Sequence, residues 1–483
     1  MKRKLLLTTF VLGTILAQGA MAADPVALTI DDAIYRAFAT NPAVKIAGYE
    51  LDAARANMHA VRLSRGLTIT GQHTTRRSGN KDYGSTPLAT EYIQLNDVNG
   101  NLYNAVKLNN TRTKGIGNNH SNSVSASIPL YTGGEISGAM ISAKAGYQQS
   151  VAGKQKAYND MHYTVTEAYY NCLLTQDLAK VAQESVNSLS EHLRHVQDSY
   201  DVGVVAKVDV LRSEVELADA EQNLIKADNV RKVAQHNLNK IIGLPLETEL
   251  NLTDALRFTP YEHELEYCLN FAETNRPELE QAKQGVRSAK GKVRSARSGY
   301  MPKIYGTASD NWNSVNWPGD ENENWTVGVS ATWTAFDSGV TMSRVHAAEA
   351  NARAAKETYR DTLNSVMLDV RNIYYSMNEA ERRIHTTEVI VAKAQEDYDI
   401  AQLRYQNGVG TNTDVLDAQV ALNQAKTNYI QACYDFNTSK IALDNAIGVP
   451  FKSPLEKTTV VKVKPLNVKK AKVEKVAKES EEE

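Results

Sequence analysis

Hydrophobic and polar residues follow two different periods along this chain. In long stretches apolar residues recur at alternating spacings of four and three, and in short stretches they occupy every second position. The first spacing places apolar side chains along one stripe of a helix, as in a coiled-coil seam, and the second places them on one face of a strand. The chain is therefore predicted to be mixed α and β, and mainly α.

The helical period is clearest between Gly339 and Gly408, because the residues between them include neither glycine nor proline. A helix over residues 340–405 would be about 100 Å long at about 1.5 Å per residue, which exceeds the diameter of a compact domain. The apolar seam of this helix consists of Val366, Val370, Ile373, Met377, Ala380, Ile384, Val391, Ala394, Tyr398, Ala401 and Tyr405. A matching seam earlier in the chain consists of Val186, Leu189, Leu193, Val196 and Tyr200.

A shorter helix is predicted after each long one and ends at a glycine, Gly243 or Gly448, in the position of a C-terminal cap. Each long and short pair forms a helical hairpin whose turn has the pattern Tyr-x-x-Gly-Val. The hairpins are predicted over residues 135–242 and 340–447, and two further helices over residues 29–63 and 264–298.

The strand period is clearest in residues 325–335, which are apolar at odd positions and small or polar at even ones. Trp325 and Trp333 share the apolar face and would stand about 20 Å apart in height on a tilted strand, as the aromatic girdles of a membrane barrel do. A sheet in a soluble domain alternates in the same way, so this segment alone leaves both open. Strands are predicted over residues 66–78, 120–131, 302–311 and 324–336.

The same plan occurs twice along the chain. Tyr200-Asp201-Val202-Gly203-Val204 recurs as Tyr405-Gln406-Asn407-Gly408-Val409, and Ile242-Gly243-Leu244-Pro245 recurs as Ile447-Gly448-Val449-Pro450. We therefore predict two structural repeats, residues 23–258 and 259–450. The first repeat is longer, and its extra residues are placed in the Asn-rich stretch 79–120, which has no apolar period and is predicted to be a long loop.

The two ends of the chain differ from the repeats. Residues 1–22 have a basic start, an apolar run and small residues before Ala23, which predicts an export signal. No cysteine follows that cleavage point, so no lipid anchor is expected. Residues 451–483 are rich in lysine and end in three glutamates, which predicts a disordered tail.

Composition excludes several classes of protein. The chain has 54 basic and 56 acidic residues, a balance that argues against a nucleic-acid-binding surface. Its 3 cysteines are too few and too scattered for a disulfide framework or a thiolate zinc site. Four strands cannot close around water, so several chains must share any barrel. A dimer would supply eight strands and a trimer twelve.

The signal peptide, the duplicated strand and hairpin plan, the Tyr-x-x-Gly-Val turns and the Ile-Gly-x-Pro ends together resemble the TolC family of outer-membrane efflux proteins, in its non-lipidated branch. This resemblance implies a homotrimer: a twelve-stranded β-barrel in outer-membrane lipid, continued by a twelve-helix α-barrel through the periplasm. It further implies docking with a periplasmic adaptor, or membrane fusion protein, and an inner-membrane pump of the RND, ABC or MFS type. The expected function is an exit duct for efflux or type I secretion.

The resemblance also implies roles for residues at the hairpin turns. Asp414 and Asp417 match an acidic ring that closes the duct, and three copies would bring six carboxylates to the axis. A spacing of three places both on one helix face. Without the resemblance, the sequence favours Asp414 as a first-turn acid after Thr411 that faces the positive end of its helix.

A latch beside the ring is implied for Tyr405 and Asp209. Gly410 stands where the family has an arginine, and Lys207 or Arg212 could take its place. The turn residues that would meet the adaptor are Gly203, Val204, Gly408 and Val409, and Trp325 and Trp333 would lie at the membrane interfaces.

Enzymatic functions receive little support from the sequence. Glu191, His192 and His195 could ligate a metal, but an exposed flank of a coiled coil explains them better. No phosphate loop or nucleophile motif occurs, so we expect no enzyme, no metal and no cofactor. The alternatives are a non-conducting coiled-coil protein that links the outer membrane to the envelope and, third, a soluble periplasmic enzyme.

Overall fold

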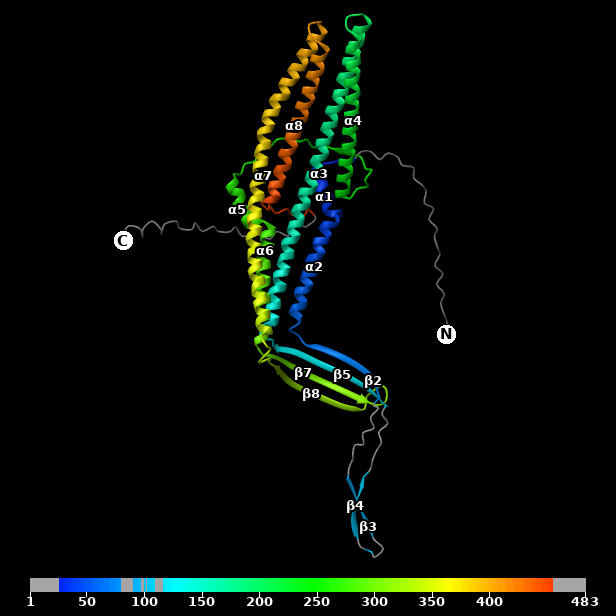
Figure 1. Ribbon diagram of the computed structural model, residues 1–483, viewed down its shortest axis with the longest axis vertical. Helices are drawn as coiled ribbons and strands as arrows, with labels where there is room; N and C mark the ends of the chain where they lie inside the picture. The colour runs from blue at the N-terminus through cyan, green and yellow to red at the C-terminus, as the bar shows by residue number, and fades with distance from the viewer. Residues whose placement is uncertain (1–25, 80–89, 97–99, 101, 109–115, 455–483) are drawn as a thin grey trace, which may run out of the picture.

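The protein is described here from a computed structural model, which covers residues 26–79, 90–96, 100, 102–108 and 116–454. The molecule is elongated and mostly helical, with long helices at one end and a sheet at the other (Figure 1). The predicted export signal and all but the first four residues of the predicted tail lie outside these residues. Within the described ranges, no helix is long and apolar enough to cross a membrane.

Two helical hairpins form the long end of the molecule. Helix α3 (Glu135–Asp201) is followed by α4 (Lys207–Ile242), and α7 (Val340–Gln406) by α8 (Asn412–Ala446). The two long helices have 67 residues each, or about 100 Å at about 1.5 Å per residue. The ends of the two hairpins, at residues 202–206 and 407–411, are called the tip below.

The other helices are broken where continuous ones were predicted. Residues 29–63 form α1 (Ile30–Thr40) and α2 (Pro42–Leu63), and residues 264–298 form α5 (Leu265–Asn275), α6 (Pro277–Arg297) and the start of a 3-10 turn η1 (Ser298–Tyr300). Both breaks precede a proline, at Asn41 and Arg276, whose ψ angles are 129° and 121°. The residue before proline is disfavoured in helical geometry, which explains both corrections.

The main sheet has four antiparallel strands in the order β2 (Thr68–Gly79), β5 (Ile116–Tyr131), β7 (Lys303–Ser314) and β8 (Asn322–Thr332). Strands β2 and β8 lie at its two edges. Strand β8 starts and ends earlier than the strand predicted over 324–336, and Trp333 lies just after its last residue.

Two further pairs of strands were not predicted. Strand β3 (Thr90–Asn96) pairs antiparallel with β4 (Leu102–Leu108), inside the stretch 79–120 predicted as a loop. That prediction was wrong for these residues, because backbone pairing needs no apolar alternation. Strands β1 (Val26–Leu28) and β6 (Leu250–Leu252) form a short parallel pair.

The core lies where the shorter helices pack against the long ones. One cluster joins α1, α3, α4 and the β1–β6 pair around the buried Tyr169 and Phe38. A second joins α5, α7 and α8 around Phe436. Phe451 packs against the first cluster, so the predicted disordered tail begins later than residue 451.

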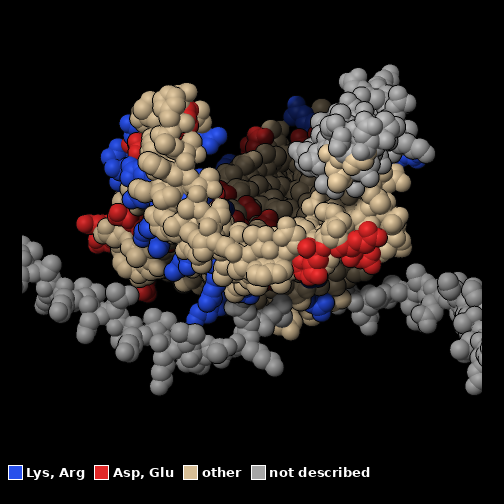
Figure 2. All heavy atoms as spheres, turned by 90° about the horizontal axis from the view of Figure 1, so that it is seen from below, with Lys and Arg blue, Asp and Glu red and all other residues tan. Residues whose placement is uncertain are grey.

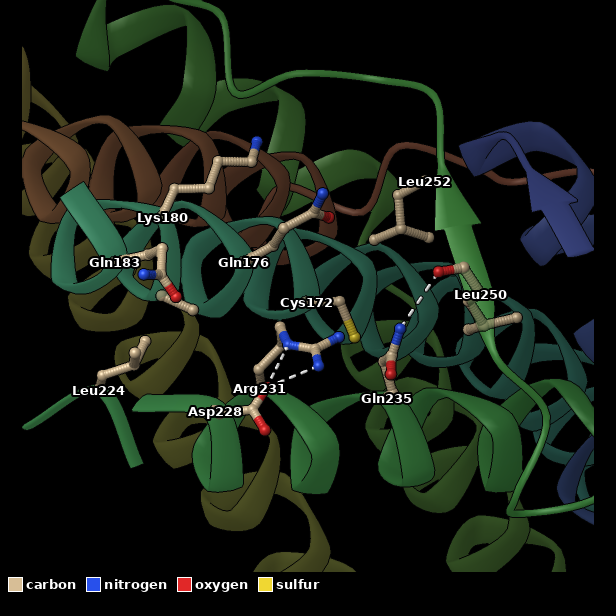
Figure 3. A pocket seen from close by; sticks show the side chains of 11 residues that line it. Cys172, Gln176, Lys180, Gln183, Leu224, Asp228, Arg231, Gln235, Leu250 and Leu252 are labelled. Atoms are coloured by element: carbon tan, nitrogen blue, oxygen red, sulfur yellow. Dashed lines mark hydrogen bonds and ion pairs between the residues drawn. The ribbon is translucent and has the colours of Figure 1, made fainter. Parts of the chain in front are cut away.

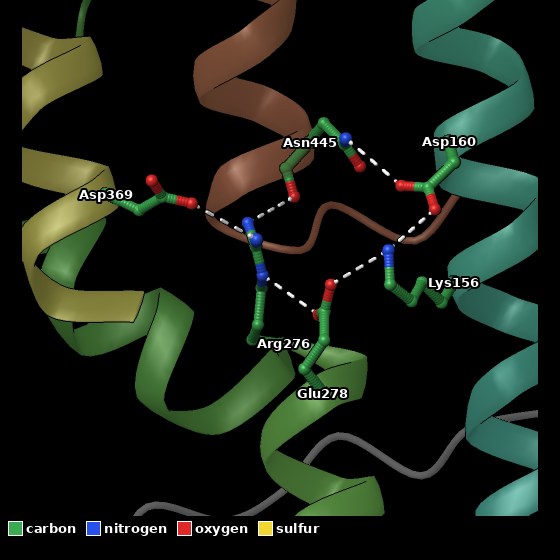
Figure 4. Close-up of polar contacts among 6 residues, drawn as sticks. All are labelled: Lys156, Asp160, Arg276, Glu278, Asp369 and Asn445. Carbon is green, nitrogen blue, oxygen red and sulfur yellow. Dashed lines mark hydrogen bonds and ion pairs between the residues drawn. The ribbon is translucent and has the colours of Figure 1, made fainter. Parts of the chain in front are cut away.

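A polar cluster ties four helices together at the same level (Figure 4). Arg276 donates to the carbonyl of Asn445 at the end of α8 and pairs with Glu278, at 3.1 and 2.9 Å. Asp369 of α7 lies 3.6 Å from the same guanidinium, and Lys156 of α3 lies 3.2 Å from Glu278. The Arg276 guanidinium, which lies at the C-terminal end of α8, also interacts favourably with the negative end of that helix dipole.

The helices form a single curved layer rather than a closed bundle. Toward the tip, α4 contacts α3, α3 contacts α8, and α8 contacts α7; toward the sheet, α2, α3, α6 and α7 follow one another. Seen along the long axis, the layer bends around a hollow that is open on one side, with acidic side chains on its inner surface (Figure 2). Its free flanks are α4 and α2 on one side and α7 on the other.

Candidate functional site: the hairpin tip and the two-faced sheet

The two faces of the main sheet have opposite chemistry. One row across the four strands consists of Ile69, Ala126, Ala308 and Val327, and the next row, on the opposite face, consists of Thr70, Ser125, Ser309 and Thr326. The sheet therefore has one mainly apolar face, which Asp310 interrupts between Val124 and Trp325, and one face of hydroxyl and amide side chains.

Among the residues that the structure describes, no helix or strand covers the apolar face. Trp325, Val327 and Val329 are 70%, 72% and 71% exposed, and Ile69 on the opposite edge strand is 66% exposed. Trp333 is also exposed, and its indole N–H donates to the carbonyl of Tyr300 at 3.2 Å. An exposed apolar patch of this kind marks contact with lipid or with another protein.

At the tip, the turns place apolar side chains in solvent. Gly203 and Gly408 have φ angles of 80° and 70°, a left-handed geometry that favours glycine. The valines that follow them, Val204 and Val409, are exposed. The four turn residues predicted for adaptor docking are therefore accessible, which leaves their role a proposal.

Asp414 forms a capping box at the start of α8. Its carboxylate accepts from the Thr411 backbone N–H at 3.0 Å, and the Thr411 hydroxyl accepts from the Asp414 N–H at 3.2 Å. The backbone hydrogen bond from Thr411 lowers the pKa of Asp414, and the nearby Arg404 adds to the effect. The first-turn role considered for Asp414 is therefore present.

Asp414 and Asp417 do share one face of α8. Both are exposed and line a groove of about 430 Å³ between α7 and α8, together with Asp397 and Arg404. The paired carboxylates thus face one open space, as the spacing of three predicts. Their arrangement in a ring depends on other copies of the chain.

The predicted latch residues lie close together without a hydrogen bond between their side chains. Tyr405 is half-buried; burial raises its pKa, and the charge of Asp209 raises it further. Within the described part of the chain, the Tyr405 hydroxyl has no hydrogen-bond partner. Arg212, a suggested substitute for the missing arginine, instead donates to the Thr413 hydroxyl at 3.1 Å and so joins α4 to α8.

Gly410 has a packing reason to lack a side chain. A Cβ there would lie 3.1 Å from the Cβ of Arg404 and 3.1 Å from the backbone nitrogen of Tyr405. The Gly410 N–H also donates to the Arg404 carbonyl at 3.1 Å. An arginine at this position would crowd the last turn of α7.

A buried polar layer at the tip was not predicted from the sequence. His192 of α3, Ser213 of α4 and Asn412 of α8 are all buried, and we call these three residues the polar layer. The exposed flank expected for His192 is wrong, although His195 is partly exposed and its ring nitrogen lies 3.9 Å from Glu191. Among the described residues, no cluster of three potential ligands could hold a metal.

A second cavity lies between α3, α4 and β6 (Figure 3). It measures about 340 Å³, and Arg231 and Asp228, two of its lining residues, are paired with each other at 2.6 Å. Burial raises the pKa of Cys172 on its wall to about 12, so that thiol is protonated at neutral pH and is a poor nucleophile.

A sheet with an exposed apolar face, joined to hairpins about 100 Å long, defines the class of elongated subunits that contact lipid or other protein chains. The model of the outer membrane efflux protein family matches residues 33–244 and 269–449. The chain therefore belongs to this family, and its location is the outer membrane.

Individual relatives are more distant. The chain is 25% identical to the outer membrane protein TolC of Escherichia coli over 296 residues, covering 58% of this chain and 60% of TolC. It is also 25% identical to the alkaline protease secretion protein AprF of Pseudomonas aeruginosa, covering 60% and 62% of the two chains. The match thus spans about three fifths of these relatives, 60% and 62% of their lengths.

Solved structures show that the fold is shared over nearly the whole chain. The Campylobacter jejuni CmeC outer membrane channel superposes with a TM-score of 0.73 at 16% identity, covering 88% of this chain and 86% of CmeC. The predicted resemblance to the TolC family is confirmed.

Proposed function

We propose that three copies of this chain form an outer-membrane exit duct for efflux or secretion. The observation that carries this proposal is the open sheet, whose two edges are unpaired and whose apolar face is uncovered within the described part of the chain. A long, exposed, apolar edge strand promotes association with other chains, and closure into a barrel removes it. Pairing β8 of each copy with β2 of the next would give twelve strands from three copies of four.

The two faces of the sheet fit the two environments of such a barrel. The row through Ile69 and Val327 would face lipid, and the row through Thr70 and Thr326 would line a wet interior. Trp325 and Trp333 would mark the membrane interfaces. Eight strands leave an interior filled by side chains. Twelve strands, from three copies, are therefore the smallest multiple of four that leaves a water-filled lumen.

The helices support the same closure. Their single layer has α7 at one flank and α4 with α2 at the other, and short connections join α2 to β2 and β8 to α7. Repetition around an axis would therefore close the helical wall above the barrel. Matches of one family model to two ranges, 33–244 and 269–449, support the proposed duplication into repeats 23–258 and 259–450.

The tip is the proposed point of control and of partner docking. Asp414 and Asp417 from three copies would form an acidic ring that favours cations. The exposed turns at Gly203, Val204, Gly408 and Val409 would contact a periplasmic adaptor, which would connect the duct to an inner-membrane pump. The duct itself would do no chemistry and would use no cofactor.

The test is the conductance of the purified protein in a planar lipid bilayer. We expect an ion current that a trivalent cation blocks from the helical side, and we expect Asp414→Ala with Asp417→Ala to relieve the block. Asp198→Ala with Asp201→Ala removes two exposed acids of the same spacing from the other hairpin and serves as the control. A protein that inserts but carries no current would instead support the non-conducting structural alternative.

A further inference from the structure

The first turn of α8 lies against both helices of the other hairpin. Asn412 is 4% exposed, and its side chain reaches α3 on one side and α4 on the other. The Nε2 of His192 lies 2.6 Å from the Asn412 Oδ1. The Asn412 amide group donates to the Ser213 hydroxyl at 3.2 Å and to the Asp209 carbonyl at 3.1 Å.

These contacts satisfy the asparagine completely. Its Oδ1 can only accept, so the His192 Nε2 carries a hydrogen and donates it to Asn412. Both amide hydrogens of Asn412 have acceptors on α4, and the Ser213 hydroxyl donates to the Asp209 carbonyl at 3.0 Å. Loss of any member would leave a buried donor or acceptor unpaired, which is costly.

One turn further along α8, the contact is apolar. Leu416 packs against Leu189 of α3 and Ala220 of α4. Apolar contacts of this kind tolerate sliding of one helix along another, whereas a buried asparagine specifies a single register. The polar layer therefore fixes the position of α8 along the other hairpin.

Helix α7 completes the environment of His192. The Tyr405 ring lies 5.3 Å from the His192 ring, at an interplanar angle of 56°. The titratable groups around the histidine are Glu191 and His195 on its own helix, Asp209 on α4 and Tyr405 on α7. Asn412, the residue of α8 that contacts the histidine, is neutral.

We propose that the polar layer holds the α7–α8 hairpin against the α3–α4 hairpin within one chain, and that the tip widens only after the Asn412 contacts break. Residues 192, 213 and 412 are positioning residues in this account. That widening of the tip opens a duct rests on the proposed function. The contact between the hairpins can nevertheless be tested without any current.

The experiment measures the distance between the two turns. Spin labels at Val204→Cys and Val409→Cys are placed on the full-length protein in lipid, and pulsed electron paramagnetic resonance gives the distance distribution. Both positions are exposed, whereas the native Cys172, Cys268 and Cys433 are buried. The parent protein without the added pair gives the background.

We expect Asn412→Ala and His192→Ala to raise the population of separated turns about tenfold, since each removes a buried hydrogen bond. His192→Gln should retain the parent distance, because its amide can still donate to Asn412. The control Asn428→Ala changes an exposed asparagine of the same helix and should have no effect. If Asn412→Ala prevents folding, Ser213→Ala removes one acceptor only and should shift the distances in the same direction.

Bilayer conductance of the same proteins separates the two proposals. Longer distances with raised conductance support both. Longer distances with no current in any variant would support the proposed role of the polar layer and overturn the proposed duct. A conducting protein whose turn distances are unchanged in folded Asn412→Ala and Ser213→Ala would retain the duct and overturn the role of the polar layer.

Discussion

The position of Val329 makes the membrane account testable by a single charge. Val329 lies four residues from each of Trp325 and Trp333, so it would stand at the middle of the lipid band. Lysine at the midplane on the lipid face of a barrel costs about 2–4 kcal/mol, or about 6–12 kcal/mol for three copies. Val329→Lys should therefore reduce folding into lipid at least about thirtyfold per chain.

The matched control is the adjacent residue on the opposite face. Ser330→Lys introduces the same charge one position along β8, where the side chain would face water. Urea-dependent folding into lipid vesicles, followed by tryptophan fluorescence, compares the two variants. Both positions are exposed in one chain, so a sheet in a soluble domain would tolerate both lysines equally. Equal folding of the two variants would refute a lipid-facing role for this face.

Three further predictions concern the helices. Lowering the pH from about 7.5 to about 5.5 should separate the turns. Burial lowers the pKa of His192 below its usual value near 6.5, so the packed state loses stability as the pH falls through that usual value. In the spin-label measurement, His192→Gln should abolish this pH dependence. Gly138→Val should destabilise the protein by about 1–3 kcal/mol in thermal unfolding, since a Cβ there would meet the α6 backbone at 2.5 Å, whereas Gly146→Val has open space and should not. Thr411→Ala should cost about 1 kcal/mol by removing the cap shared with Asp414, seen as faster hydrogen exchange in the first turn of α8.

Local rules predicted most of the elements. A stretch without glycine or proline predicted α7, the matching apolar seam earlier in the chain predicted α3, and alternation predicted the four strands of the main sheet. The breaks before Pro42 and Pro277 follow from a rule of the same kind and could have been anticipated. Strands β3 and β4 could not, because their pairing leaves no apolar period to read.

The site was harder to predict because it depends on contacts between distant helices. Asn412 occupies the start of α8, where the sequence suggests only a residue beside a cap. Its burial arises from the packing of α8 against α3 and α4. The residues that it contacts there, His192 and Ser213, lie 220 and 199 residues away along the chain. The one available signal was a polar residue four positions before Leu416, in line with an apolar stripe.

Closure of the open sheet by other copies is the central claim, and cysteine pairing between its edges tests it most directly. One cysteine at Thr326 on β8 is combined with a series along β2, at Thr70, Gln72 or Thr74, and oxidised in native membranes. The account predicts that one register cross-links efficiently and that the ladder of linked chains stops at three. Absence of cross-links in every register, or a ladder that continues past three chains, would contradict it.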